Sequence, residues 1–319
     1  MRRRLHHASG VGARSTQHAR NNREGNRMAV MGFVFIDKPV GPTSFDIVRE
    51  ARKALGVKAI GHAGTLDPAA SGLLFLAVGK ATKLLRFLPL EPKVYRFSMR
   101  FGATTDTLDE EGTVVEEGGA IPEETSLRAI LPRFVGTIRQ VPPRFSAVRV
   151  GGVRAYTLAR KERDFELAAR TARINSLELH EYDRERAVAV MSVACSTGTY
   201  VRALARDIAS ELGTIAVTTS IRREKIGRTA VEDARGLEEL RSNADHCLVP
   251  VAEVVSALPH YRASKGELRE LSFGREIAPP APEYEPKFLF VFGPYMEPAA
   301  VVRKTARGTY HPERVLVNR

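Results

Sequence analysis

The hydrophobic residues of the chain follow two periods, which predict strands and helices in mixed order. The apolar stretch 32–36 predicts a buried strand, and 72–78 predicts another after a glycine-rich loop. Residues 94–101 alternate between a face with Tyr95 and other large apolar side chains and a face with Arg96 and other polar ones. Such alternation is typical of a strand with one buried face and one open, basic face.

A first helix is predicted where Thr43 or Ser44 can cap the chain and Gly56 can end it. Its apolar residues, three to four positions apart, are Phe45, Val48, Ala51 and Leu55. Further elements predicted in the same way are a strand at 188–193 and helices near 81–88, at 123–135, at 153–163 and at 200–212. The mixed order favours an α+β fold with an antiparallel or mixed sheet.

The pattern changes after Pro250, and again around the proline-rich stretch 279–282. Short apolar runs separated by Gly and Pro follow, at 288–292, 299–302 and 315–317. We therefore expect a main domain over 28–250 and a small β-rich, barrel-like domain over 251–319.

Residues 1–27 contain seven arginines and one glutamate and show no apolar periodicity, which predicts a flexible basic arm. The arm lacks the apolar core of a secretory signal. An organellar transit peptide, or a start of translation at Met28 or Met31, are alternative interpretations of the same stretch.

Composition adds the class of partner. With 43% hydrophobic and 27% charged residues among 319, the chain is ordinary globular protein, and its net charge of +12 predicts a polyanionic partner. The two cysteines, Cys195 and Cys247, have no CxxC spacing, which excludes disulfide scaffolds and zinc ribbons and fits a reducing cytoplasm. No apolar run reaches the ~18–20 residues of a membrane span.

The usual cofactor motifs are absent, so the chemistry should rest on carboxylates, hydroxyls and arginines without metal or nucleotide. The candidate is the loop 61–72, whose small residues allow a large ligand to approach the backbone. Pro68 biases Asp67 towards an extended conformation, from which its carboxylate can act as a nucleophile. Taken alone, Asp-Pro is also a common way to start a turn.

The loop, with the preceding D-K-P-x-G-x-T-S of 37–44, resembles the TruB family of tRNA pseudouridine synthases. Four more blocks follow in family order across roughly 32–228: K-V-Y-R at 93–96, F-G-A-T-T-D-T at 101–107, Q-V-P-P-x-x-S-A at 140–147 and C-S-x-G-T-Y-V-R at 195–202.

This resemblance implies an isomerase that converts a uridine of the tRNA T arm, usually position 55, to pseudouridine. It implies an α+β catalytic domain with a mixed or antiparallel sheet, followed by a PUA-like C-terminal domain. It also implies tRNA as partner, no cofactor, no membrane and no obligate protein partner. We expect a cytoplasmic monomer, with organellar targeting by the arm as the open alternative.

By the same resemblance, three residues carry the reaction. Asp67 matches the catalytic aspartate, which attacks the anomeric carbon or the base, or assists an elimination. Arg202 matches its guanidinium partner. Tyr200 matches a tyrosine that transfers a proton or positions the base, and it opens the predicted helix 200–212.

Five more positions are predicted to bind the substrate. Tyr95 matches a tyrosine that stacks on the uracil, and Ile221 stands where the family has a pocket leucine. His62 matches the histidine that fills the space left by the flipped base. Lys38 belongs to the first block, and Arg96 lies on the basic strand face. With Arg96, the candidates for holding phosphates are Arg100, Lys80, Lys83, Arg86, Arg222, Arg223, Lys225 and Arg228.

Three other functions compete with this interpretation. An RNA-folding factor would not need Asp67. A guide-RNA-dependent synthase shares the catalytic loop but needs partner subunits. A carboxylate glycosidase also acts at an anomeric carbon, yet it usually needs two catalytic carboxylates, and no second motif of that kind is present.

Overall fold

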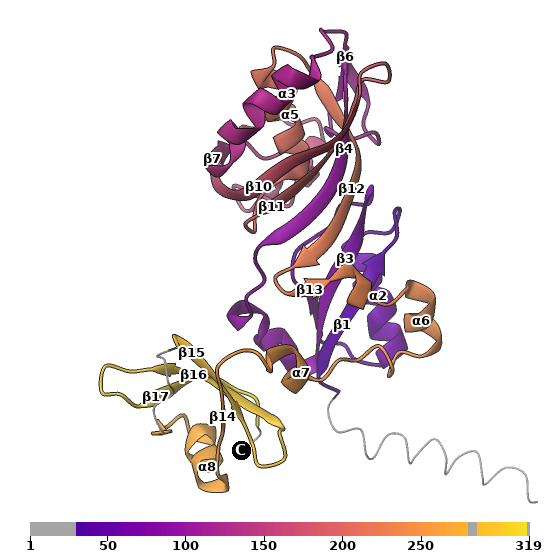
Figure 1. Cartoon of the computed structure of the whole chain (residues 1–319). Helices are drawn as coiled ribbons and strands as arrows, with labels where there is room; N and C mark the ends of the chain where they lie inside the picture. The colour runs from indigo at the N-terminus through magenta and orange to yellow at the C-terminus, as the bar shows by residue number, and fades with distance from the viewer. Residues whose placement is uncertain (1–29, 280–285, 318–319) are drawn as a thin grey trace, which may run out of the picture.

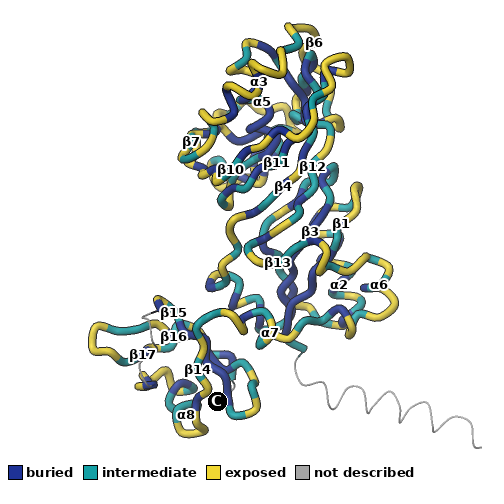
Figure 2. Tube along the Cα trace, in the orientation of Figure 1, coloured by how far each residue is buried: buried dark blue, intermediate teal, exposed yellow. Residues whose placement is uncertain are grey.

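A computed structural model describes residues 30–279 and 286–317. The basic arm predicted over 1–27 lies outside these residues. The described chain forms a long twisted sheet with helices against it, and a separate small β-domain follows at the C-terminal end (Figure 1). Buried positions run along the strands of the sheet, and exposed ones gather at the loops and outer helices (Figure 2).

The main sheet is mixed, as the sequence predicts. Its strand order is β1 (Gly32–Lys38), β3 (Ala70–Val78), β12 (Ala216–Ile226), β4 (Lys93–Phe101), β11 (Val188–Cys195), β10 (Arg170–Asp183) and β7 (Gly136–Gln140). β2 (Ile60–His62) pairs with β3, and β13 (Thr229–Ala230) pairs with β12. Along this order only β3 and β12 run parallel. Two small hairpins stand apart: β5 (Ala103–Thr105) with β6 (Val114–Glu117), and β8 (Arg149–Val150) with β9 (Val153–Arg154).

The predicted alternation in β4 is confirmed. Tyr95 and the apolar residues that share its face are buried, while Arg96 is exposed. The buried face packs against α5 (Val201–Glu211), which supplies Leu204 and Ile208 to the same core. This packing leaves the opposite face of β4 free to present charge.

Helix α2 (Ser44–Leu55) begins and ends as predicted. Thr43 and Asp46 form a reciprocal capping box, and Gly56 ends the helix in the left-handed conformation. Of the periodic apolar residues, Val48, Ala51 and Leu55 are buried, but Phe45 is 58% exposed and lies under the Arg52 guanidinium. Ile47 takes the buried position in the first turn instead.

The predicted helix 200–212 is confirmed as α5, whereas the three other predicted helices are shorter than expected. The stretch near 81–88 forms two 3-10 helices, η1 (Gly79–Lys83) and η2 (Leu85–Phe87). The stretch 123–135 divides into α3 (Glu124–Ile130) and η3 (Leu131–Phe134), with Pro132 at the start of the second. Of 153–163, only α4 (Ala155–Ala159) is helical after β9. After β13 the chain forms η4 (Val231–Asp233), α6 (Leu237–Ser242) and α7 (Val251–Val255).

The C-terminal domain is small and β-rich, as predicted. Its sheet has the order β14 (His260–Arg262), β15 (Phe288–Phe292), β16 (Pro298–Lys304) and β17 (Tyr310–Val315). The sequence analysis missed α8 (Lys265–Ser272), although Ser264 and Glu267 form its capping box.

The C-terminal domain is joined to the main domain by side-chain contacts. Phe87 and Phe288 meet edge to face at 5.0 Å, and Lys80 donates a hydrogen bond to the Leu316 carbonyl. Val251 and Val255 of α7 pack in a cluster that also contains residues of β1 and β15. The predicted boundary between 250 and 251 stays a prediction, because α7, which begins at 251, packs against both the main domain and the C-terminal domain.

The parallel junction of β3 and β12 is short and tightly packed. It pairs 70–72 with 221–223, and Gly72 faces Arg223. A Cβ at Gly72, where φ is +98°, would lie 2.3 Å from the Arg223 carbonyl oxygen. Only glycine fits this position, because both the backbone angle and the close approach exclude a side chain.

We expect Gly72→Ala to lower the free energy of unfolding by about 2–4 kcal/mol, from left-handed strain plus overpacking. Urea unfolding followed by circular dichroism measures the loss. Gly266→Ala is the matched control, because Gly266 lies inside α8 and its nearest neighbour to a new Cβ is 3.9 Å away. Equal stability of the two variants would contradict the close packing of the junction.

Candidate active site

The loop between β2 and β3 carries Asp67, and buried side chains hold its backbone. Ser44 Oγ accepts a hydrogen bond from the Leu66 N–H at 2.8 Å and donates one to the Leu66 carbonyl at 3.0 Å. Lys38 Nζ, at the end of β1, donates to the Pro68 carbonyl at 3.4 Å. The residues on both sides of Asp67 are therefore anchored to other elements.

Arg202 is the centre of charge in the site. Its side chain is 5% exposed, and its Nη2 lies 2.7 Å from Asp67 Oδ2. Its Nη1 lies 3.1 Å from Asp109 Oδ2 and also donates to the Thr107 carbonyl, while Nη2 donates to the Phe145 carbonyl at 3.0 Å. One buried guanidinium thus joins two carboxylates and fixes the direction of Asp67, whose side chain remains 39% exposed.

The position of Arg202 depends on how α5 begins. Tyr200 precedes the helix, and the Gln140 side chain binds both backbone groups of this residue. Gln140 Oε1 accepts from the Tyr200 N–H at 2.8 Å, and Gln140 Nε2 donates to the Tyr200 carbonyl at 3.2 Å. The last residue of β7 therefore fixes the first turn of α5, where Arg202 lies.

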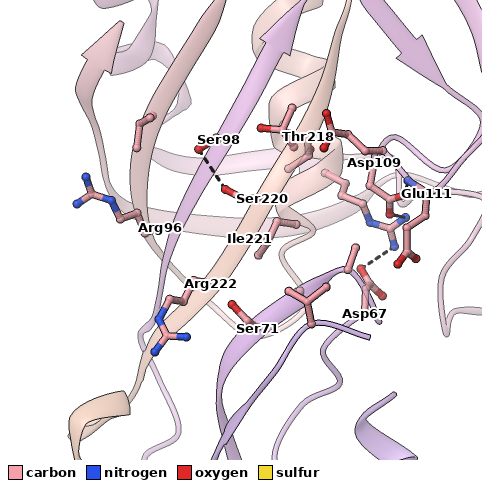
Figure 3. Close-up of a pocket in the computed structure, with 17 residues that line it drawn as sticks. Asp67, Ser71, Arg96, Ser98, Asp109, Glu111, Thr218, Ser220, Ile221 and Arg222 are labelled. Carbon is pink, nitrogen blue, oxygen red and sulfur yellow. Dashed lines mark hydrogen bonds and ion pairs between the residues drawn. The ribbon is translucent and has the colours of Figure 1, made fainter. Parts of the chain in front are cut away.

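Asp67 and Arg202 line a cleft of about 500 Å³. Arg96 and Arg222 lie on one side of it, and Asp67, Asp109 and Glu111 lie on the other (Figure 3). The remaining residues that line the cleft are Val40, Ala69, Ala70, Ser71, Ser98, Glu110, Val190, Thr218, Thr219, Ser220 and Ile221. The cleft is electrostatically uneven, with a basic side and an acidic side.

The predicted site residues divide into two groups. Asp67, Arg202, Ile221 and Arg96 line the cleft together. Tyr95, Tyr200, His62 and Lys38 are not among its lining residues. The Asp67 charge contributes to the pKa of Lys38, Tyr95 and Tyr200, which places all three groups near the carboxylate.

Burial sets the protonation of the four predicted residues that do not line the cleft. It raises the pKa of Tyr95 and of Tyr200, so both phenols are protonated at neutral pH. Burial, together with the Arg223 charge, lowers the pKa of His62, so its imidazole is neutral. Burial also lowers the pKa of Lys38 to about 8.

The proposed phosphate contacts need correction at Arg223. This residue is fully buried, so it cannot bind RNA phosphates. Lys80 and Arg86 face the C-terminal domain, where Arg86 lies 3.8 Å from Glu313. The candidates on open surface are Arg96, Lys83, Lys225 and Arg228, and Arg100 and Arg222 are half-buried.

The sequence analysis missed several residues that position the site. Asp109 lies just beyond the T-D-T block, and Thr107 Oγ1 binds its carboxylate at 2.6 Å. Gln140 stands inside a recognised block, but the sequence offered no reason to connect it with Tyr200. Ser44 was named as a possible helix cap and as the last residue of the first block, but neither predicted its hydrogen bonds to Leu66. Motif membership marked this region, whereas the partner of each side chain became visible only in three dimensions.

Among residues 30–279 and 286–317, no group of three or more His, Cys, Asp and Glu side chains could hold a metal ion. No helix in the same ranges is long and apolar enough to cross a membrane.

Comparison with known proteins identifies the class. Residues 52–201 match the family model described as "TruB family pseudouridylate synthase (N terminal domain)". The chain is 42% identical over 253 residues to tRNA pseudouridine synthase B of Arthrobacter sp. (strain FB24), covering 77% of this chain and 82% of that one. It is 42% identical over 256 residues to the protein of the same name from Thermobifida fusca (strain YX), covering 78% and 87%.

The fold is shared with solved structures. A chain of the "Crystal Structure of a Cbf5-Nop10-Gar1 Complex" superposes with a TM-score of 0.67 at 24% identity, over 90% of this chain and 85% of that one. The family model and the names of these relatives define the class: the chain is a pseudouridine synthase, an isomerase.

Within that class, the chain belongs to the TruB family.

A pH dependence of stability follows from Lys93, on the first position of β4. Burial, with a contribution from the Arg223 charge, lowers its pKa from 10.5 to about 8. Between these values the unfolded chain binds more protons than the native chain, so the contribution of Lys93 to stability rises with pH. We expect the difference in unfolding free energy between parent and Lys93→Met to shift in favour of the parent by about 1–2 kcal/mol from about pH 7.5 to about pH 9.5.

Urea unfolding at the two pH values measures this shift. Lys83→Met is the control, because it removes a lysine that folding leaves exposed. If the difference between parent and Lys93→Met were the same at both pH values, the lysine would not be titrating in this range.

Proposed function

We propose that the enzyme converts a uridine of tRNA, at position 55 of the T arm, to pseudouridine, with Asp67 as nucleophile. The observation that carries this proposal is the Asp67 carboxylate held at 2.7 Å from buried Arg202 in a cleft of about 500 Å³. The related bacterial proteins are named tRNA pseudouridine synthase B, which supports tRNA as the substrate.

The reaction is an isomerisation, so the cleft has to hold and turn one base without consuming a second substrate. The bond from the sugar C1′ to N1 breaks, a bond from C1′ to C5 forms, C5 loses a proton and N1 gains one. Asp67 attacks C1′ or the base, or assists an elimination; in each case it must stay ionised and correctly aimed. Arg202 orients the Asp67 carboxylate through hydrogen bonds whose geometry is fixed by the protein, whereas hydrogen bonds from mobile water would not fix it.

The two tyrosines are assigned to the base. Tyr200, as a protonated phenol at the start of α5, can donate and accept a hydrogen bond while the detached uracil turns. Tyr95 is 8% exposed, so its stacking on the uracil requires a local shift of the side chains that cover it. Ile221 lines the cleft and supplies the apolar wall of the pocket.

A uridine inside a folded arm must leave its stack before it reaches Asp67, at a cost of a few kcal/mol. His62 is assigned to the space that the base leaves. Its Nδ1 is buried without a hydrogen-bond partner in the described part of the chain. Because its ring is neutral, the side chain can move from this buried position into the stack of bases. Lys38 is assigned to substrate binding through the loop that it holds.

The wider contact with tRNA is assigned to the basic side of the cleft and to the PUA-like domain. Arg96 and Arg222 are cross-strand neighbours on β4 and β12, and Arg222 is held in a bidentate ion pair with Asp37, so Arg96 is the one assigned to phosphates next to the flipped nucleotide. We place the enzyme in the cytoplasm as a monomer acting without a protein partner, with the domains divided at 250.

Asp67→Asn should abolish isomerisation, by at least about 10⁴-fold, because an amide is not a nucleophile. Pseudouridine is mapped on an unmodified tRNA transcript by carbodiimide labelling and reverse-transcriptase stops, without added metal or cofactor. Asp183→Asn is the matched control, since Asp183 is similarly exposed and pairs with an arginine, Arg186, at a distant turn. Binding of tRNA should persist in both variants. Full activity of Asp67→Asn would remove the nucleophile; tRNA binding without isomerisation by the parent would favour an RNA-folding role.

Arg96→Ala should weaken tRNA binding and reduce the dependence of log affinity on log salt by about 1, the loss of roughly one phosphate contact. Filter binding over a series of salt concentrations measures the slope. Arg133→Ala is the control, because Arg133 is exposed at the other end of α5 and pairs with Glu211. Equal slopes for parent and Arg96→Ala would place the phosphates elsewhere.

A further inference from the structure

Arg223 is a large buried cation without an assigned role. It stands in the middle strand of the β3–β12–β4 junction, and its side chain is fully buried. No ion pair joins it to a carboxylate among the described residues. A buried guanidinium is costly unless its geometry is well satisfied, so its hydrogen bonds indicate what it does.

The guanidinium binds the chain on both sides of Asp67. Its Nη2 donates to the Gly64 carbonyl at 3.1 Å, and Nη1 donates to the Thr65 carbonyl at 3.3 Å. Its Nε donates to the Leu73 carbonyl at 2.8 Å, beyond the loop in β3. The fork of Arg223 therefore fixes the separation of the two ends of the catalytic loop.

The same side chain lies against Tyr95. Arg223 and Tyr95 are cross-strand partners in the pairing of β12 with β4, so their side chains share one face of the sheet. The guanidinium carbon lies 5.9 Å from the centre of the Tyr95 ring. One residue thus contacts both the loop that carries the nucleophile and the ring assigned to the uracil.

The glycines beside Arg223 are consistent with this close fit. Gly64 has a φ of +109°, and a Cβ there would lie 2.6 Å from Lys93 Nζ and 3.6 Å from Arg223 Nη1. The loop lies so close to the buried cations that it has no room for a side chain at this position. Lysine could not replace the guanidinium, because three nitrogens of Arg223 donate to three separate carbonyls and a single ammonium group cannot reach all of them.

We propose that Arg223 is a positioning residue, which sets the Asp67 loop and the Tyr95 ring at the separation that the reaction requires. Its kinetic consequence rests on the proposed function. Because Arg223 is buried, it acts on the chemical step and not on the binding of tRNA. A displacement of about 1 Å between reacting groups costs about 100-fold in rate.

The test compares Arg223→Met, Arg223→Lys and Leu240→Ala in the full-length chain. Leu240 is a fully buried residue of α6, outside the site, and its truncation reports the effect of lost stability alone. Single-turnover rates on unmodified tRNA, tRNA affinity and thermal unfolding are measured for each variant. Amide hydrogen exchange is followed over residues 64–67.

We expect Arg223→Met to lower the single-turnover rate by about 100-fold with tRNA affinity changed less than about threefold. Arg223→Lys should recover only part of the rate, and both variants should speed exchange at 64–67. Leu240→Ala, with a comparable loss of thermal stability, should keep its rate. An unchanged rate in Arg223→Met, full recovery in Arg223→Lys, or a loss that tracks stability in all three variants would overturn the proposal.

The exchange measurement separates this proposal from the proposed function. If the parent chain does not isomerise any tRNA uridine, the function is wrong, and exchange at 64–67 still decides whether Arg223 holds the loop. If the parent is active and exchange in the variants is unchanged, the function stands and the role of Arg223 is wrong.

Discussion

The parallel pairing of β3 with β12 is the constraint on which the site depends. It joins the strands β1 and β3 to the larger antiparallel part of the sheet over three residue pairs. Asp67 lies just before this pairing begins, and Tyr95 lies opposite Arg223 in the next strand. The two halves meet at this pairing, and the absence of a side chain at Gly72 allows the close approach that brings the Asp67 loop next to Arg223 and Tyr95.

Charge is buried around this junction in two different ways. Arg202 is balanced by the carboxylates of Asp67 and Asp109, so its direction is set by ionic contacts. Arg223 donates to three carbonyl oxygens and lies against the Tyr95 ring, with no carboxylate partner among the described residues, and Lys38 donates to the carbonyls of proline residues. Carbonyl acceptors leave the net positive charge in place. The loop that holds Asp67 therefore lies against buried positive charge, an arrangement that suits a reaction in which negative charge develops.

The sequence predicted those parts of the fold that depend on local pattern. The alternation in β4, the caps of α2 and the strand-rich C-terminal domain follow from spacing and turn chemistry, and the order of motifs located Asp67 and Arg202. Phe45 was misplaced because a helix pattern does not say which neighbours will cover the first turn. Asp109, Gln140 and the burial of Arg223 could not be predicted, because each depends on a partner from a distant strand. The run R-R at 222–223 was predicted to contact phosphates. Successive residues of a strand point to opposite faces, however, so Arg223 is buried.

Strand β3 has one further consequence, which concerns length. It leaves the catalytic loop at Ala70 and ends at Val78, directly before the segment whose Lys80 and Phe87 contact the C-terminal domain. A strand of this length spans roughly 30 Å, and hydrogen bonding to β1 prevents it from stretching. The Asp67 loop and the C-terminal domain are thus separated by a fixed interval. A nucleic acid that contacts both must have its two contact points separated by the same distance. The fixed length of β3 therefore selects substrates by their shape.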